Sequence, residues 1–230
     1  MKTTISILFA TSLLFLGIPG SGDAYIINYD FATDGTGYTS PYSNVQIETF
    51  DRESLLWTWS GNGAIVAGSL KSRYAAPYGI TEPDPTLYLT VPENIQEESD
   101  YSAQLGGDYN YLGLWWGSVD AYNSLKFYND GILVESITGL QATNPNAANG
   151  TQTNKTSNLY INFLGLPTFD SISLVSTNYA FEADNIAVGD MNPVPEPGTM
   201  QLLGLGLVGL IGLRRKLQWP CPPKTEPLQT

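Results

Sequence analysis

The side chains that could do chemistry in this chain are carboxylates, because histidine, the most versatile catalytic residue, is missing. The sequence of 230 residues has 22 Asp and Glu but no histidine. This composition excludes the usual general base, the usual zinc ligand, and the Ser-His and Cys-His nucleophile pairs. The one cysteine, Cys221, stands near the C-terminal end, so the chain before it has neither a disulfide nor a reactive thiol.

Paired carboxylates can hydrolyse glycosides, and this is the enzyme activity that the composition leaves open. Acidic pairs arise by chance in so acidic a chain, and no nucleophile motif, phosphate-binding loop or metal-ligand cluster accompanies them. We therefore expect a protein that is not an enzyme, assign no catalytic residue, and keep a glycoside hydrolase as the least favoured alternative.

Carboxylates could instead hold a structural calcium ion, as in many jelly-roll glycan-binding modules, where the first strand meets the last. Asp30 lies near the end of the first expected strand, and Glu182 and Asp184 belong to the last. Glu182 and Asp184 are two residues apart, so they point to the same face of that strand. Two such carboxylates repel unless they are solvated or bridged by a cation, and oxygen ligands suit calcium. The alternative is that both face water.

Tryptophans offer a second kind of site, because aromatic rings stack on sugars. Trp57 and Trp59 lie on one face of an expected strand and could bind a glycan. Trp115 and Trp116 are adjacent, so they point to opposite faces, and at least one should belong to the core. Packing inside a β-sandwich is the alternative for the first pair as well.

The charge of the chain argues against nucleic acid as a partner. Net charge is −12, and residues 25–192 contain 5 Lys and Arg against 19 Asp and Glu, a net charge of −14. So acidic a domain repels phosphates, whereas it suits a solvated outer surface or one that recruits cations.

The elements that position these side chains are expected to be β-strands. Short segments alternate between apolar and polar residues, and most of these segments are bounded by Gly, Pro, Asn or Asp. The composition, rich in aromatic and turn-forming residues, favours an all-β fold, a jelly-roll-like β-sandwich. The expected strands cover residues 25–31, 45–50, 55–60, 64–70, 86–91, 109–116, 124–129, 132–138, 159–164, 171–176 and 179–188. Residues 93–100 could form one helical turn, and residues 140–158 form a flexible polar loop.

One hairpin can be specified residue by residue. Asp130-Gly131 is a signal for a two-residue type I′ turn. It predicts that Tyr128 pairs with Leu133, Phe127 with Val134, Lys126 with Glu135, and Leu125 with Ser136. Opposite charges would then face each other on one side and apolar residues on the other.

Both ends of the chain have the composition of targeting segments. Lys2 precedes an apolar stretch over residues 5–18, and Gly22-Asp23-Ala24 offers small residues at a cleavage site, so residues 1–24 are expected to be a signal peptide. Near the other end, residues 200–213 form an apolar run rich in Gly and Leu, expected to be a single transmembrane helix.

The C-terminal run is framed by short motifs. A Pro195-Glu196-Pro197 triplet precedes it within the linker 193–199, and Arg214, Arg215 and Lys216 follow it within the extension 214–230. The basic residues would hold that end in the cytoplasm. Triplet, helix and basic cluster together resemble the PEP-CTERM sorting signal, the substrate of membrane enzymes called exosortases. The resemblance implies that the triplet marks the processing region and that the helix is removed during transfer to the cell surface. The chain departs from the family's pattern in continuing to Thr230.

The domain 25–192 adds a second resemblance. Residues 107–139 (GDYNYLGLWWGSVDAYNSLKFYNDGILVESITG) and 181–188 (FEADNIAV) are similar to a family of exosortase-dependent bacterial surface proteins. That likeness implies a β-sandwich on the cell surface.

These observations predict an exported protein that is anchored in the inner membrane before sorting, with an exosortase as its partner, and is then surface-bound or extracellular. Its role would be structural or adhesive, in an exopolysaccharide matrix such as a biofilm or on the envelope. The alternative is a carbohydrate-binding, lectin-like module with a structural calcium.

Overall fold

The computed structural model describes residues 25–191 except residues 36, 95–97 and 144–146. The expected signal peptide, the sorting residues Pro195, Glu196, Pro197, Arg214, Arg215 and Lys216, and the apolar run 200–213 lie outside the described residues. Among the helices that the structure describes, none is long and apolar enough to cross a membrane.

The described part of the chain is almost entirely β-structure. Its elements are β1 (Ile26–Asn28), β2 (Ala32–Thr33), β3 (Tyr38–Thr39), β4 (Gln46–Glu48), β5 (Thr58–Gly61), β6 (Ala64–Ala67), β7 (Leu87–Val91), β8 (Ser99–Gly117), β9 (Asn123–Asn129), β10 (Ile132–Thr138), α1 (Gly139–Ala142), β11 (Leu159–Ser176) and β12 (Phe181–Gly189).

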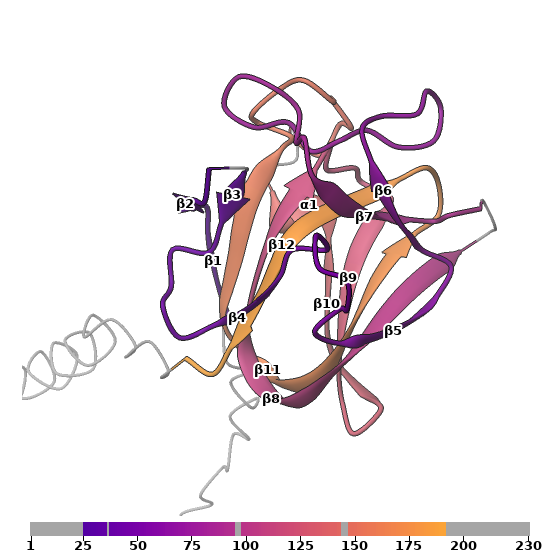
Figure 1. Ribbon diagram of the computed structural model, residues 1–230. Coiled ribbons are helices and arrows are strands. Elements are labelled where there is room, and N and C mark those ends of the chain that lie inside the picture. The colour runs from indigo at the N-terminus through magenta and orange to yellow at the C-terminus, as the bar shows by residue number, and fades with distance from the viewer. Residues whose placement is uncertain (1–24, 36, 95–97, 144–146, 192–230) are drawn as a thin grey trace, which may run out of the picture. The chain divides into compact units, whose positions relative to one another are not determined.

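Two long antiparallel strands, β8 and β11, build a sandwich-like arrangement by running through both of its layers (Figure 1). Each strand bends near its middle, where Gly106 and Gly165 have φ near +73° and the pairing register shifts. On one side of the bend β8 pairs with β5 and β11 pairs with β9, which in turn pairs with β10; we call this the first layer. On the other side β11 pairs with β1 and β8 pairs with β12, which continues to β4 and to β7 and β6; this is the second layer. The expected all-β, sandwich-like fold is confirmed.

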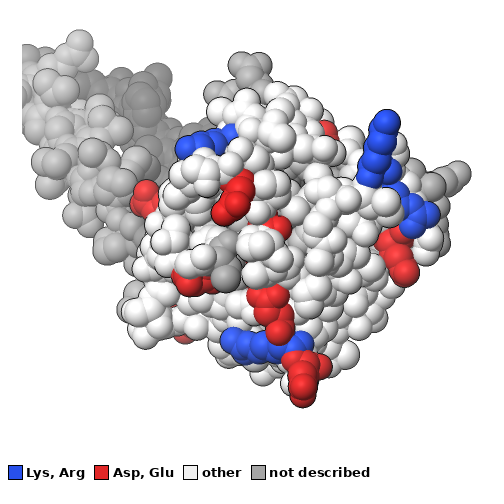
Figure 2. Space-filling view, turned by 45° about the horizontal axis from the view of Figure 1, so that its top comes forward, with Lys and Arg blue, Asp and Glu red and all other residues white. Residues whose placement is uncertain are grey.

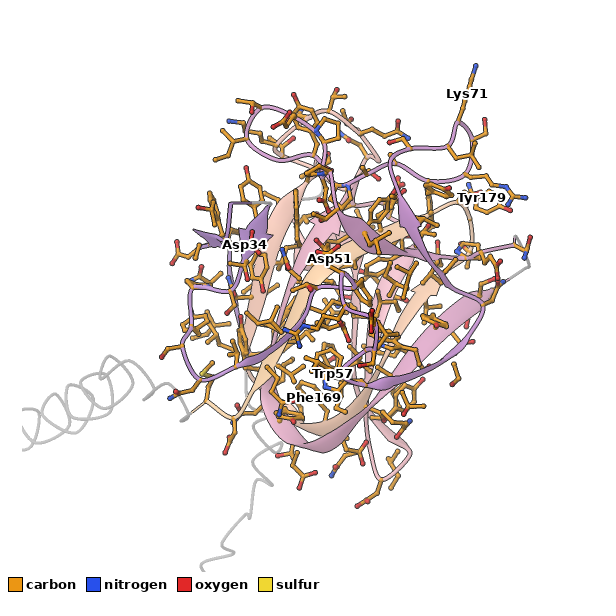
Figure 3. All side chains as sticks on the ribbon, viewed as in Figure 1. Asp34, Asp51, Trp57, Lys71, Phe169 and Tyr179 are labelled. Atoms are coloured by element: carbon orange, nitrogen blue, oxygen red, sulfur yellow. The ribbon has the colours of Figure 1, made fainter. Side chains whose placement is uncertain are left out.

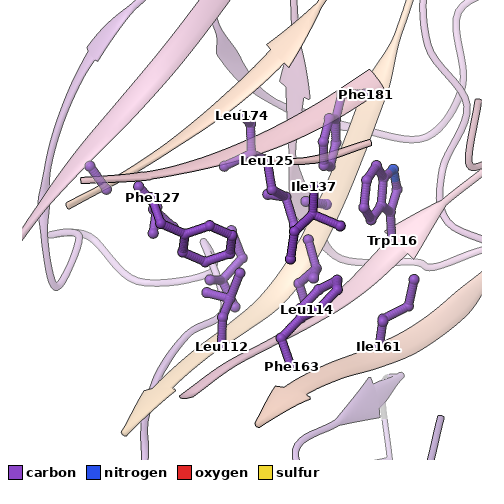
Figure 4. Packing of buried hydrophobic residues seen from close by; sticks show 14 of the residues in the cluster. Leu112, Leu114, Trp116, Leu125, Phe127, Ile137, Ile161, Phe163, Leu174 and Phe181 are labelled. Carbon is purple, nitrogen blue, oxygen red and sulfur yellow. The ribbon is translucent and has the colours of Figure 1, made fainter. Parts of the chain in front are cut away.

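The main core lies between the layers (Figure 4). Trp116 of β8 stacks on Phe181 of β12, with ring centroids 4.2 Å apart and planes 7° from parallel. Such a pair adds about 0.5–1.5 kcal/mol to the stabilisation that comes from burying the two rings. Side chains of both layers surround this stack, all fully buried: Leu112, Leu114, Leu125, Phe127, Ile137, Ile161, Phe163 and Leu174.

The outer face of the second layer is also buried, because the segment near the N-terminus covers it. Trp115 points to this face and packs against Tyr38 and Tyr160. Tyr38 belongs to the small β2–β3 hairpin, which sequence analysis missed because each strand is only two residues long. Both members of the Trp115–Trp116 pair are therefore buried, on opposite sides of one sheet.

The β9–β10 hairpin has the expected turn but only part of the expected register. Asp130 and Gly131 have φ of +50° and +75°, as a type I′ turn requires, and Leu133 pairs with Tyr128. Beyond that pair a β-bulge at Val134 shifts the register by one residue.

The remaining three pairings of the hairpin were wrong. Glu135 stands opposite Phe127, Ser136 opposite Lys126, and Ile137 opposite Leu125. The bulge turns Ile137 to the core side, where it is fully buried, whereas the straight register would have placed Ser136 there. Burial of one isoleucine thus outweighed the pairing of Lys126 with Glu135. Lys126 contacts Glu98 instead, at 3.2 Å.

Acidic side chains are dispersed over the face of the domain that Figure 2 shows. On the face shown in Figure 2 they form separate patches among uncharged residues rather than one continuous area. This distribution favours a solvated surface over one that gathers cations along an acidic stripe.

Candidate functional site

A polar pocket of about 390 Å³ opens where four loop segments meet. Its walls come from residues 72–74, 118–122, 149–152 and 178–182, and we call it the Tyr122 pocket. Tyr179, at its rim, is labelled in Figure 3 below Lys71. The segments belong to four different connections between strands, so the fold alone brings them together.

Hydrogen bonds fix the turn between β11 and β12, which forms one wall. The phenol of Tyr122 donates to the carbonyl of Tyr179 at 2.6 Å. The neighbouring Asn123 donates its amide to the carbonyl of Ala180 at 3.2 Å. Ser176 donates to the carbonyl of Asn178 at 2.6 Å, which closes the turn from its other side.

The opposite wall is part of the polar segment 140–158, which was expected to be a flexible loop. Its described residues are anchored instead by Asn158, which is buried. The side-chain oxygen of Asn158 accepts from the backbone of Tyr78 and Ser118, both at 2.9 Å. Its side-chain nitrogen donates to the carbonyls of Thr151 and Asn154. The wall is therefore preformed.

Gly150 lets this wall approach Asp120 closely. The backbone nitrogen of Gly150 donates to the carbonyl of Val119 at 3.0 Å, and its φ is +66°. A Cβ at this position would lie 2.5 Å from Oδ1 of Asp120, closer than real contacts allow. The glycine is required both for its backbone conformation and for space. Burial raises the pKa of Asp120.

Glu182 forms the floor of the pocket and is only 2% exposed. Its Oε1 accepts from the backbone of Ala75 at 2.8 Å, and its Oε2 contacts the hydroxyl of Ser118 at 2.7 Å. Burial raises the pKa of Glu182 to about 8, although the two hydrogen bonds oppose the rise. Glu182 is therefore mostly a neutral acid at pH 7.

Arg73 brings a positive charge to the rim. Its guanidinium lies 5.6 Å from the ring centroid of Tyr179, within the range of a cation–π contact. The pocket thus offers a cation, phenol and amide groups, and one partly accessible carboxylate.

The expected calcium ligands do not assemble. Glu182 and Asp184 point to the same face, as predicted, but that face is buried, so they do not face water. Asp30 is exposed and contacts Asn28 rather than the other two. Within the described ranges no group of three or more His, Cys, Asp or Glu could hold a metal ion.

Asp184 contacts a different acid, Asp84, which sequence reasoning did not single out. The two buried carboxyl groups interact electrostatically, and among the described residues Oδ2 of Asp84 and Oδ1 of Asp184 have no hydrogen-bond partner. Asp84 also accepts from the backbone of Thr86 at 2.9 Å. Burial raises the pKa of both aspartates.

The two tryptophans considered for glycan binding lie away from the Tyr122 pocket. Trp57 is 5% exposed and belongs to the main core. Trp59 is half-buried and stacks on Tyr101, with centroids 5.2 Å apart. Their positions fit core packing, the alternative weighed from the sequence. The pocket residues Arg73, Tyr122 and Tyr179 were missed, since turn residues carry no periodic signal.

Comparison with known proteins bears on the end of the chain. A family model described as the PEP-CTERM protein-sorting motif matches residues 193–216. The expected sorting motif is thus confirmed, and it supports exosortase-dependent sorting to the cell surface. A search of curated proteins found no match to this chain.

Proposed function

We propose that this chain, which carries a PEP-CTERM sorting motif, is a non-enzymatic adhesive protein of the cell surface or exopolysaccharide matrix, and that it binds glycan in the Tyr122 pocket. Residues 200–213 hold it in the inner membrane until an exosortase acts. This proposal joins the adhesive role expected from the sequence to its lectin-like alternative.

The observation that carries the proposal is the preformed polar wall of the pocket. Sugars present many hydroxyl groups, which bind best to donors and acceptors already held in place. Tyr122, Asn149, Gln152 and Asn178 supply such groups from three anchored segments. A volume of about 390 Å³ accommodates a sugar unit or two.

Glycoside hydrolysis is the second candidate, favoured by one observation. Asp120 and Glu182 line the same pocket, and a carboxyl with a pKa of about 8 could donate a proton at neutral pH. However, both oxygens of Glu182 already contact Ala75 and Ser118, and the side chain is almost fully buried. Its proton is therefore not presented to a ligand, which favours binding over catalysis.

Binding can be tested with the full chain in detergent on a glycan array. We expect retention of one or more polysaccharide fragments by the wild type and at least a tenfold loss in Tyr179→Ala and Gln152→Ala. The control is Tyr29→Ala, an exposed tyrosine outside the pocket. Equal binding by all four proteins, or none by the wild type, would refute the role of the pocket. Release of reducing ends would instead support the hydrolase.

Sorting can be tested separately in the producing cell. Glu196→Ala and deletion of residues 200–230 should each block maturation, and the deletion should also end membrane retention. A Glu53→Ala variant, altered on the exposed domain surface, is the control and should mature normally. Unchanged maturation in both test variants would contradict exosortase dependence.

A further inference from the structure

We infer that the Tyr122 pocket selects sugars that carry a carboxylate, uronic acid residues, and that Arg73 is the group that recognises them. The inference rests on the proposed function and names the class of ligand for the same pocket. It follows from where positive charge is placed in a domain that is otherwise strongly acidic.

Positive charge is scarce in residues 25–192, which contain five Lys and Arg. Two of the five, Lys71 and Arg73, stand on the single turn that forms one rim of the pocket. The turn is closed by backbone bonds from Leu70 to Tyr74 at 2.9 Å and from Arg73 to Leu70 at 3.0 Å. Arg73 is therefore held at the rim by a fixed backbone.

Arg73 is also oriented and available. Its guanidinium contacts the ring of Tyr179, and among the described residues no carboxylate oxygen lies within ion-pair distance of Arg73, since the one ion pair there joins Lys126 to Glu98. The N–H donors of a guanidinium point outward in its own plane, so they stay available to a ligand when one face of the group rests on a ring. Two parallel donors match the two oxygens of a carboxylate, which lysine cannot reproduce.

The acids of the pocket do not cancel this charge. Glu182 is mostly neutral at pH 7 because it is buried, so the floor of the pocket carries little negative charge. Asp120 is the remaining opposing group, and it is packed against Gly150. Its carboxylate should weaken the binding of an anionic sugar, and its removal should strengthen that binding. The ring hydroxyls of the sugar would contact the amides and phenols of the walls.

The test measures affinity of the full chain in detergent for three probes: a galacturonate oligomer, the neutral galactose oligomer of equal length, and a sulfated galactose oligomer. We expect the wild type to prefer the galacturonate oligomer by about tenfold or more. Arg73→Ala should abolish the preference, because it should weaken binding of the galacturonate oligomer more than binding of the neutral oligomer. Arg73→Lys should retain a minor part of the preference, and Asp120→Asn should increase the preference.

Arg52→Ala is the matched control, because Arg52 is exposed and lies outside the pocket. Equal losses in the Arg52 and Arg73 variants would indicate general attraction and overturn the inference, as would preference for the sulfated probe. Melting temperatures verify that each variant is folded. If the neutral oligomer binds as well as the galacturonate oligomer and Tyr179→Ala loses both, glycan binding stands and selection of uronates is wrong. If no probe binds, both proposals fail.

Discussion

Replacing Glu182 by Gln should make the protein more stable at alkaline pH while leaving its stability near pH 4 almost unchanged. The carboxyl is 2% exposed and contacts the backbone N–H of Ala75 and the hydroxyl of Ser118, which can donate or accept. Glutamine can accept from Ala75 with its oxygen and donate to the hydroxyl of Ser118 with its nitrogen. It therefore reproduces the protonated acid in the same place.

The size of the effect follows from the difference in pKa between folded and unfolded chains. Below about pH 4.5 Glu182 is protonated in both states and contributes no pH dependence. As pH rises towards the folded pKa of about 8, unfolding releases a proton, so the free energy of unfolding falls with pH and the loss is complete above that value. At about 1.36 kcal/mol per pH unit, the rise from 4.5 to about 8 corresponds to a loss on the order of 5 kcal/mol.

Urea unfolding followed by tryptophan fluorescence at pH 4 to 9 measures this difference. The wild type should lose several kcal/mol over the range, and Glu182→Gln should lose less by an amount approaching that figure. Other buried acids titrate in the same direction, so the comparison between the two proteins isolates Glu182. Glu53→Gln, at an exposed position, should follow the wild type. Parallel curves for wild type and Glu182→Gln would refute the buried neutral carboxyl.

Three further substitutions test the core and the pocket. Trp116→Ala should cost about 3–5 kcal/mol in urea unfolding because it empties the centre of the core and leaves Phe181 without its stacking partner. Gly150→Ala should lower the melting temperature and glycan binding together, since its Cβ would lie 2.5 Å from Asp120 and its φ is +66°. Trp57→Phe should leave glycan binding unchanged because Trp57 lies in the core; a loss would show that the binding surface lies elsewhere.

Local signals predicted much of the fold. The strands over 124–129 and 132–138 were found almost to the residue, because alternation and an Asp-Gly turn agree there. The bulge at Val134 was missed, since it depends on which layer Ile137 meets. At Gly106 and Gly165 a single strand bends and continues into the other layer. Sequence analysis placed strand ends there, because a glycine can mark either a bend within a strand or the end of one.

The pocket was harder to predict, because it depends on contacts between segments that are far apart in the sequence. Glu182 and Asp184 were correctly placed on one face, but what covers that face depends on residues more than 100 positions away, such as Ala75. A carboxylate on a strand is predicted to face solvent unless the segment that packs over it is known. Arg73, Tyr122 and Tyr179 belong to three separate connections between strands and meet only because the fold brings these connections together.

The course of β12 has a mechanical consequence. Its first residues reach the floor of the pocket, and its last residues lead to Met191, after which the chain continues into the sorting motif at residues 193–216. Under the proposed function, the glycan is held mainly by pocket walls outside β12, and the chain is held beyond Met191, so a pull acts between β12 and the rest of the domain. Such a pull would shear the hydrogen bonds of β12 with β4, β7 and β8 together instead of opening them one by one. Such a geometry suits a molecule that must hold while it is pulled.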